Sequence, residues 1–344
     1  MIILSNCLTD AADEGCRKVV SSLVRRIKAA SPETLVVSCG SESAMSDRNI
    51  SVNKLMVSSE LGDLLKRRKE PLLYLPAPAK MRSTAIRLFM LSRYARWGLR
   101  VILPMEFPVD PLSRRLILAS GAEVIALSRS TWTAYRQALG DRADYLRTGV
   151  DTQRFVPVSR ERKAALRKAY GLPGDKPIVL HVGHLRQGRG IGCMAGISGD
   201  FHCVLVASTQ TADERDAQLR QQLERRPNMT IFDQYLPRIE ELYQLADVYL
   251  FPVEQPGNCI DVPLSALEAA SCGIPVAATA YGELRELLGQ PGFYETGALK
   301  PETLNSLLAK ICNEGKTPRE SVLKYDWNLA VAQLLPEDSE ERRI

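Results

Sequence analysis

Residues 263–279 read PLSALEAASCGIPVAAT, and this stretch decides how the chain folds. Pro263 suits the first turn of a helix, because proline lacks the N–H that this turn leaves unpaired. Gly273 and Pro275 end that helix, since glycine favours the position after a helix and proline cannot continue one. The run Pro275–Ala278 is apolar on both faces, as in a strand buried inside a parallel sheet. A helix followed at once by a buried strand indicates an α/β fold.

The same alternation of helix and strand extends in both directions along the chain. Short apolar runs are typical of buried strands, and amphipathic runs such as Glu14–Ala30, Met81–Trp97 and Ile239–Leu245 are typical of helices. The expected strands are Ile2–Ser5, Thr34–Cys39, Leu55–Ser58, Leu72–Leu75, Arg100–Leu103, Val124–Leu127, Ile178–Val182, Val204–Ala207, Met229–Phe232, Val248–Phe251 and Pro275–Ala278.

The chain is long enough for two domains, since 344 residues exceed the roughly 100–200 of one domain. The expected strands fall into two series, on either side of residues 150–160. We therefore expect two Rossmann-like, doubly wound α/β domains that face a cleft, with the ligand outside the carboxyl ends of the strands. The expected divisions are residues 1–155, residues 156–322 and a helical tail, 323–344, that crosses back toward the first domain.

The composition is that of an ordinary soluble globular protein, with 45% hydrophobic and 25% charged residues. The chain has no run of about 18 apolar residues, so we expect no membrane-spanning helix. The chain opens into a strand-like run without the features of a signal peptide, and its eight cysteines form no CxxC pair. Both observations favour the cytoplasm. A zinc site is not expected, because His181, His184 and His202 lack ligand spacing with cysteine.

Positive charge is concentrated in the first half of the chain. Residues 1–155 hold 24 Lys and Arg against 15 Asp and Glu, whereas the remaining residues hold 21 against 25. A basic region usually meets an anionic partner, and the absence of any nucleic-acid-binding motif argues against nucleic acid. An acceptor that carries phosphate or an anionic membrane surface fits better.

The candidate for a membrane surface is the run Met81–Arg100, which combines arginines with aromatic residues at helical spacing. Lys66–Lys69 forms a second basic cluster. The alternative is a helix that faces the core and has a solvated basic side.

Glu268 lies among Leu267, Ala269 and Ala270 in the helix of residues 263–279. A buried carboxylate is costly unless a partner pairs with it, and the paired hydroxyls of a ribose are a natural partner. The alternative is a glutamate on a solvated helix face.

Residues 181–192 read HVGHLRQGRGIG, so a buried strand runs into a glycine-rich turn that holds Arg186 and Arg189. Glycines let the backbone approach an anion, and guanidinium groups match phosphate oxygens. The alternative is a plain turn with solvated arginines. A dinucleotide fingerprint is disfavoured, because the spacing is GxGxG rather than GxGxxG and the next strand ends in Ser208-Thr209 without an acid.

Several segments, in their order along the chain, resemble the retaining nucleotide-sugar glycosyltransferases of family 4, which have the GT-B fold. Thr148-Gly149-Val150-Asp151 with Phe155 resembles the family's NGVD…F, and residues 183–190 resemble GRLxxxKG. Residues 243–252 resemble YxxADVxxxPS, and residues 268–279 resemble EAMACGxPVVAT. Glu286 fits a later GGxxE, and residues 325–327 resemble a YSW before the last helices. The resemblance covers the second domain almost throughout and the first mainly by fold pattern.

The resemblance implies transfer of a sugar, with retention, from a nucleotide-diphosphate sugar to a saccharide or a polyprenyl- or lipid-linked acceptor, as in polysaccharide or glycolipid synthesis. It implies that Glu268 holds the ribose and that Arg189, in place of a lysine, contacts the diphosphate. No cofactor is implied and no metal is expected, since the chain lacks a DxD motif. Lipid acceptors imply a peripheral location at the inner face of the plasma membrane. The donor-binding candidates are Gly15, Gly183, His184, Arg186, Arg189, Gly257, Cys259, Ile260, Asp261, Leu264 and Glu268.

Two departures from the family pattern concern the second domain. His184 stands where the family has an arginine, and a neutral histidine donates one hydrogen bond rather than a fork; Arg186 is a candidate to compensate. Ile260 stands where the family has a second glutamate. Asp261, or backbone N–H groups of residues 257–261 at the helix start, are candidates to hold the sugar or phosphate instead.

A third departure concerns the first domain, in which no histidine precedes residue 181 although many members use one there. Glu106, at the carboxyl end of an expected strand, is a catalytic candidate together with Asp261; the alternative for Glu106 is a surface glutamate. Of the family's Gly-Gly, this chain keeps one glycine, Gly15. Gly15 either begins a helix whose N-terminus faces the diphosphate or forms a simple turn. The departures motivate a second hypothesis, a non-catalytic GT-B subunit that supports an active partner, whereas an epimerase would need histidines that this domain lacks.

Overall fold

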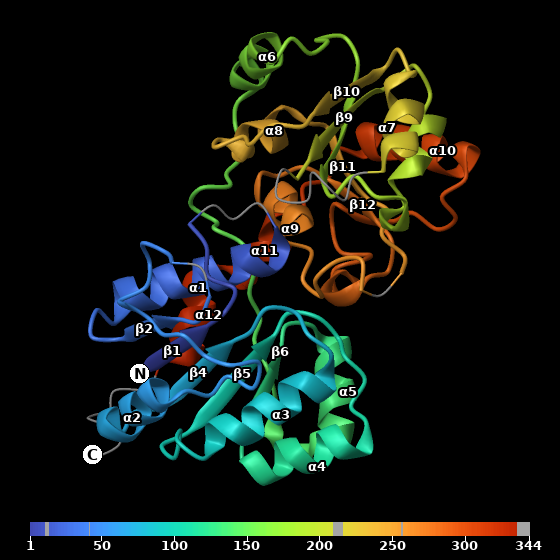
Figure 1. Cartoon of the computed structure of the whole chain (residues 1–344). Coiled ribbons are helices and arrows are strands. Elements are labelled where there is room, and N and C mark those ends of the chain that lie inside the picture. The colour runs from blue at the N-terminus through green and yellow to red at the C-terminus, as the bar shows by residue number, and fades with distance from the viewer. Residues whose placement is uncertain (11–13, 41, 209–215, 256, 336–344) are drawn as a thin grey trace, which may run out of the picture. The chain divides into compact units, whose positions relative to one another are not determined.

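The computed structural model describes residues 1–10, 14–40, 42–208, 216–255 and 257–335 (Figure 1). The chain divides into two compact units. Unit 1 comprises Met1–Thr148 together with the chain from Trp327 onward, and unit 2 comprises Gly149–Asp326. The divisions thus fall after residues 148 and 326, whereas those predicted from the sequence fall after residues 155 and 322.

Unit 1 is built on a sheet whose described strands have the order β3-β2-β1-β4-β5-β6-β7, and all the pairs are parallel. The strands are β1 (Ile2–Ser5), β2 (Leu35–Ser38), β3 (Arg48–Asn49), β4 (Leu72–Leu75), β5 (Leu99–Leu103), β6 (Glu123–Ala126) and β7 (Ala143–Tyr145). The helices are α1 (Gly15–Ala30), α2 (Ser59–Arg68), α3 (Met81–Ser92), α4 (Pro111–Ser120), α5 (Arg129–Leu139), the 3₁₀ turn η1 (Gly140–Arg142) and α12 (Trp327–Leu334).

Helices cover both faces of this sheet. On one face α1 packs against α12, and on the other α3 lies along α4 (Figure 1). Side chains alternate between the faces of a strand, so Ile2 and Leu4 of β1 enter the core under α2 to α5, where Leu88 and Ile117 are also buried.

Two predictions in unit 1 were wrong. Leu55–Ser58 is not a strand, because the side chain of Asn53 accepts hydrogen bonds from Leu55 N–H and Val57 N–H and closes a turn. The short strand β3 takes the sheet edge instead.

The predicted helix Met81–Trp97, with its basic run to Arg100, is too long. Helix α3 ends at Ser92, because β5 must begin at Leu99 to pair with Leu72 of β4. Arg100 therefore lies in a strand, and its guanidinium donates to Leu334 O at 2.6 Å.

Unit 2 repeats the same plan. Its described strands have the order β10-β9-β8-β11-β12-β13 and pair in parallel throughout. They are β8 (Ile178–Gly183), β9 (His202–Ala207), β10 (Met229–Phe232), β11 (Val248–Phe251), β12 (Val276–Ala278) and β13 (Phe293–Glu295). The helices are α6 (Arg160–Ala169), η2 (Gln187–Arg189), η3 (Ile191–Gly196), α7 (Ala217–Glu224), α8 (Ile239–Leu245), α9 (Leu264–Ser271), η5 (Gly282–Glu286), α10 (Pro301–Glu314), α11 (Arg319–Val322) and η6 (Leu323–Tyr325).

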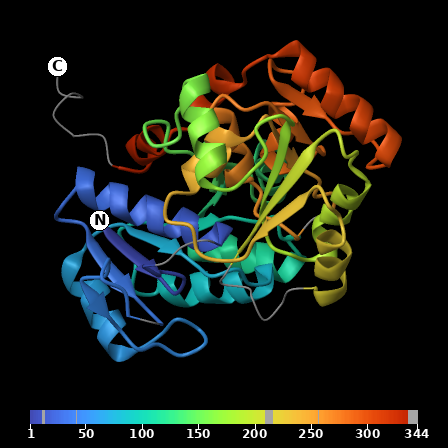
Figure 2. The same cartoon turned by 90° about the horizontal axis from the view of Figure 1, so that it is seen from above.

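The sheet of unit 2 is also covered on both faces (Figure 2). On one side η3, α7 and α10 bury Ile191, Leu219 and Leu308 against β8, β9 and β11. Helices α6, α8, α9 and α11 contact one another in turn on the other side. The prediction of two Rossmann-like, doubly wound parallel sheets is confirmed, and the cleft expected between them stays a prediction.

Candidate functional site

The loop after β8 is shaped by backbone hydrogen bonds and by one glycine. β8 is flanked by β9 and β11, so the loop leaves its carboxyl end where the strand order reverses. Arg189 N–H donates to Arg186 O at 3.1 Å and closes the turn η2. Gly190 follows with φ +71°, and a Cβ there would lie 2.1 Å from Pro252 O. Only glycine fits this position, which brings the loop against the segment after β11.

Arg189, the predicted diphosphate ligand, is buried, with 5% of its surface exposed. Its Nη1 donates to Asn258 O at 2.6 Å and thereby joins the loop after β8 to the loop after β11. The Nε atom is also buried and has no hydrogen-bond partner. The alternative of a solvated arginine in a plain turn is therefore wrong for Arg189. Arg186 is exposed, and His184 is half-buried.

His181 lies directly under this loop, in β8, and is fully buried. Its Nδ1 lies 2.8 Å from Leu250 O, which can only accept, so Nδ1 carries the proton. Burial, and then the charge of Arg189, lower the pKa of His181 to about 3, so the imidazole is neutral at physiological pH. From the sequence, His181 was weighed only as a zinc ligand, which its spacing from cysteine argued against. Nothing in that spacing predicted its contact with Leu250 O.

Glu268, the predicted ribose ligand, is 2% exposed on α9. The hydroxyl of Tyr243 donates to its Oε2 at 3.0 Å. Burial and the carboxylate charge hold the pKa of Tyr243 well above its usual value, so this hydroxyl keeps its proton. The alternative of a solvated glutamate is wrong, and a tyrosine of the segment resembling YxxADV is one partner of the buried carboxylate.

Tyr249 connects these two regions. Its ring stacks on His181 with centroids 6.2 Å apart and lies 5.9 Å from the ring of Tyr243. Its hydroxyl donates to Ser265 Oγ at 2.6 Å, in the first turn of α9. One buried set of polar side chains in unit 2, which we call the polar layer, therefore comes from β8 and the loop after it, α8, β11 and α9: Arg189, His181, Tyr249, Tyr243 and Glu268.

Residues 257–261 do not form the start of a helix, which corrects the prediction of a helix N-terminus there. α9 begins at Leu264, after Pro263. Within the loop, Cys259 N–H donates to the hydroxyl of Tyr281 at 3.2 Å, and Asp261 O accepts from Glu283 N–H at 2.8 Å. Both groups are thus engaged within unit 2. Tyr281 and Asn258 belong to the site although the sequence did not single them out.

The remaining candidates in this region differ in their exposure. Ile260, Asp261 and Leu264 are buried, Cys259 is half-buried and Gly257 is exposed. Gly257 has φ +84° and open space around it. Burial is the first cause of the raised pKa of the Cys259 thiol.

In unit 1, Gly15 is the first residue of α1, as predicted for a residue that opens a helix. The helix N-terminus is already capped, because the carboxylate of Glu14 accepts from Cys16 N–H at 3.0 Å and from Arg17 N–H at 3.1 Å. Glu106 follows the carboxyl end of β5 and is exposed. Its loop is tied to Tyr135, whose hydroxyl accepts from Phe107 N–H at 3.1 Å.

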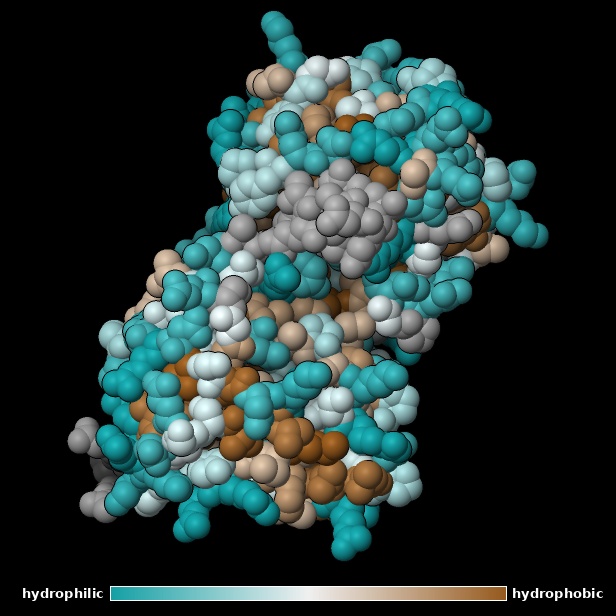
Figure 3. Space-filling model, viewed as in Figure 1, coloured by the Kyte–Doolittle hydropathy of each residue, from teal (hydrophilic) through white to brown (hydrophobic). Residues whose placement is uncertain are grey.

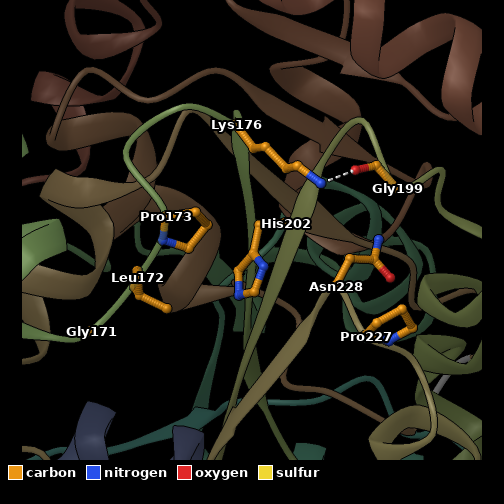
Figure 4. Close-up of a pocket in the computed structure, with 8 residues that line it drawn as sticks. All are labelled: Gly171, Leu172, Pro173, Lys176, Gly199, His202, Pro227 and Asn228. Carbon is orange, nitrogen blue, oxygen red and sulfur yellow. Dashed lines mark hydrogen bonds between the residues drawn. The ribbon is translucent and has the colours of Figure 1, made fainter.

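A separate pocket of about 460 Å³ lies at the amino ends of β8, β9 and β10 (Figure 4). Lys176, His202 and Asn228 are among its lining residues. It contains none of the predicted site residues, and the glycine-rich turn with Gly183 and Arg189 follows the opposite, carboxyl end of β8. Across the described ranges, no group of histidine, cysteine and acidic side chains is arranged to hold a metal ion. No helix in those ranges is long and apolar enough to span a membrane.

The family model described as Glycosyl transferases group 1 matches residues 177–313, within unit 2. The chain is 29% identical, over 185 residues, to the GDP-mannose-dependent alpha-(1-6)-phosphatidylinositol monomannoside mannosyltransferase of Mycolicibacterium smegmatis, covering 49% of this chain and 47% of that protein. It is 24% identical, over 201 residues, to the sulfoquinovosyl transferase SQD2 of Arabidopsis thaliana, covering 54% of this chain and 38% of that protein. The matched stretch thus spans less than half of either relative.

The fold as a whole is similar to that of Anabaena HepE, solved in complex with UDP, with a TM-score of 0.74 at 17% identity over 97% of this chain and 98% of HepE. At such low identity the likeness shows the fold alone. The resemblance to family 4 glycosyltransferases of the GT-B fold is confirmed by these comparisons. The region that matches the family model contains Gly183, Arg189 and Glu268.

Proposed function

We propose that this protein is a glycosyltransferase that takes a sugar from a nucleotide-sugar donor, with retention and without a bound metal, and transfers it to a saccharide or lipid-linked acceptor. The polar layer is the observation that carries the proposal, because it places a buried arginine and a buried carboxylate in one site within the matched region. The curated relatives whose names specify a nucleotide sugar, GDP-mannose, support a donor of this class.

The two charged groups suit the two ends of a nucleoside diphosphate. The oxygens of Glu268 would accept hydrogen bonds from the ribose hydroxyls, and the hydroxyl of Tyr243 would keep the carboxylate in place. Arg189 would neutralise the diphosphate as its bond to the sugar breaks.

The overall reaction breaks the bond between the sugar C1 and the diphosphate oxygen and forms a bond from C1 to the acceptor oxygen. The acceptor's proton would pass to the departing phosphate, and Asp261 and Glu106 are the candidate groups on the sugar and acceptor sides. With phosphate charge held by Arg189, this scheme needs no metal ion.

Nucleotide binding is tested by thermal shift and calorimetry with UDP, GDP, ADP and their sugar conjugates. We expect the wild type to be stabilised by one of them and Glu268→Ala to lose most of that stabilisation. Glu302→Ala, an exposed glutamate on α10, is the matched control. If no nucleotide stabilises the wild type, the proposed donor site is wrong; if Glu268→Ala behaves as wild type, the ribose assignment is wrong.

Transfer is tested with the donor that binds and a panel of saccharide and lipid-linked acceptors. We expect a product whose anomeric configuration, read by NMR, equals that of the donor, and a rate that EDTA leaves unchanged. An inverted product would contradict retention, and a rate abolished by EDTA and restored by a divalent ion would contradict metal independence.

A second candidate, a non-catalytic GT-B subunit, is favoured by Ile260, which is buried where the family has a glutamate. Such a subunit would bind a nucleotide or a partner and never turn a donor over. Binding without donor hydrolysis or transfer, across the whole panel, would favour it over the enzyme.

We also propose that unit 1 docks on an anionic membrane through the outward side of α3 and α4. Hydrophobic side chains gather over these helices in Figure 3. Leu112 and Leu118 of α4 are 47% and 37% exposed, and Trp97, after α3, is 58% exposed. Exposed arginines lie on the same two helices and in the segment after α3, namely Arg82, Arg93, Arg96, Arg114 and Arg115. Exposed apolar side chains on helices that also carry exposed arginines suit the interface of a bilayer with anionic head groups.

Co-sedimentation with phosphatidylglycerol vesicles and with neutral phosphatidylcholine vesicles tests the docking surface. We expect binding to anionic vesicles that falls in Arg93→Glu/Arg96→Glu and persists in the control Arg160→Glu/Lys168→Glu, on α6 of unit 2. Equal binding by both variants would contradict the proposal.

A further inference from the structure

The side chains of Arg189 and His181 meet beside Gly183. A Cβ built on Gly183 would lie 2.6 Å from Arg189 Nη2 and 3.0 Å from His181 Nε2, so both nitrogens occupy the same side of this glycine. His181 Nε2 and Arg189 Nε are each buried and make no hydrogen bond. Unpartnered buried polar atoms are costly, and one on each of two neighbouring side chains requires an explanation.

The proton on His181 decides what Nε2 can do. Nδ1 donates to the main-chain carbonyl of Leu250, which leaves a lone pair on Nε2 of the neutral ring. A guanidinium has five N–H groups. Arg189 donates to Asn258 O and has a side-chain hydrogen bond with Cys259, whereas its Nε–H has no partner. His181 Nε2, an acceptor without a donor, thus lies in the side chain next to a guanidinium whose Nε–H has no acceptor.

We propose that His181 is a positioning residue for Arg189: when a diphosphate binds, Nε2 accepts a hydrogen bond from the guanidinium, which holds it beside Gly183 and turns its outer N–H groups toward the diphosphate. This inference rests on the proposed function, because Arg189 needs such positioning only if it binds a phosphate group. Gly183 takes part by having no side chain, which leaves room for the guanidinium against the strand.

The arrangement explains why an arginine works where the resembling family has a lysine. A planar guanidinium with several N–H groups can bond Asn258 O and a lone pair behind it and still present a fork to phosphate oxygens. A lysine ammonium carries all three of its N–H donors on one nitrogen atom. His181 and Arg189 therefore act as a pair, and the pair is what an experiment must break.

Two substitutions of His181 separate its two nitrogens. His181→Asn keeps a donor near Nδ1 for Leu250 O and removes the Nε2 acceptor, whereas His181→Gln keeps an acceptor near Nε2. The readout is the ratio of affinities for a nucleoside diphosphate and its monophosphate, measured by calorimetry with UDP and UMP, GDP and GMP, and ADP and AMP. We expect His181→Asn to reduce this ratio roughly tenfold, as for loss of a charge-assisted contact, and His181→Gln to restore most of it.

A double-mutant cycle with Arg189→Ala gives the decisive control, because coupled residues have non-additive effects. In the Arg189→Ala background, His181→Asn should have no further effect on the ratio. An equal loss in both backgrounds, or no loss in His181→Asn alone, would overturn the positioning role. If the wild type binds none of these nucleotides, the proposed function fails instead. Unfolding midpoints of all variants show whether a lost ratio reflects a lost fold.

Discussion

The first strand of each unit has the same position in its sheet, but the loops that follow the two strands carry side chains of opposite charge. β1 lies between β2 and β4, and β8 lies between β9 and β11, so each is followed by a loop where the strand order reverses. In unit 1 that loop ends with Glu14, whose carboxylate caps α1. In unit 2 it carries Arg189, buried beside Gly183.

This difference indicates that the sheet topology sets where a ligand binds, whereas the charge of the loop residues sets which ligand binds. A carboxylate on the first N–H groups of α1 competes with any anion for them, whereas a buried guanidinium attracts one. We therefore expect the loop of unit 2, and not the loop of unit 1, to dominate nucleotide affinity.

The largest expected effect comes from Gly190→Ala, which would break the loop of unit 2. Alanine at φ +71° is strained, and its Cβ would collide with Pro252 O. We expect a loss of about 3 kcal/mol or more in the unfolding free energy of unit 2 and loss of nucleotide binding, measured by urea denaturation and calorimetry. Gly174→Ala, where a Cβ meets nothing within 4 Å, should be nearly neutral. Similar values for both variants would contradict the tight approach of the two loops.

The second prediction concerns pH and His181, which has no counterpart in unit 1. Its pKa is about 3 in the folded chain and about 6.5 when unfolded. The unfolded chain therefore takes up a proton first as pH falls, and stability that is complete above about pH 6.5 is lost progressively toward pH 3. At pH 5 this amounts to about 2 kcal/mol.

Urea denaturation at pH 5 and pH 7.5 checks this prediction, with His181→Asn as the comparison because asparagine does not titrate. The wild type should lose more stability than the variant between the two pH values. Equal losses would show that His181 is not buried in its neutral form. His202 also has a lowered pKa, through burial and Lys176, and is present in both proteins.

Gly183→Ala tests the space beside the strand at a smaller expected effect. The backbone of Gly183 lies outside the left-handed region, so alanine is allowed there and acts by pushing Arg189 away and crowding His181 Nε2. We expect roughly tenfold weaker nucleoside diphosphate binding with little change in unfolding. Gly192→Ala, where a Cβ would make an ordinary contact at 3.6 Å, is the control. Unchanged affinity in Gly183→Ala would place the diphosphate elsewhere.

Glu14→Ala sharpens the comparison from the side of unit 1. Loss of the cap should destabilise unit 1 by about 1 kcal/mol, measured by denaturation, and Glu14→Gln should lose less because it keeps an oxygen acceptor. Nucleotide affinity should not change. Tighter binding by Glu14→Ala would show that α1 offers its N-terminus to an anion once the carboxylate is removed, which would contradict the assignment of the site to unit 2 alone.

Much of the fold was predictable because its signals are local. Ile2–Ser5, Leu72–Leu75, Met229–Phe232 and Val248–Phe251 form strands with the expected bounds, since each is a short apolar run between polar or turn residues. The strand predicted at Leu55–Ser58 failed because the side chain of Asn53 closes a turn there. The helix predicted to Trp97 was too long because pairing with β4 sets the start of β5.

By itself, the sequence determined the two parallel sheets, the glycine loop after β8 and the residue types, arginine and glutamate, that suit a nucleoside diphosphate. The tertiary structure decided which groups they meet: Tyr243 for Glu268, and Asn258 and the neighbourhood of His181 for Arg189. Hydropathy and spacing report what a residue can do within a few positions of itself. The partner of a buried charge lies tens of residues away in the chain, and only packing of the strands brings the two together.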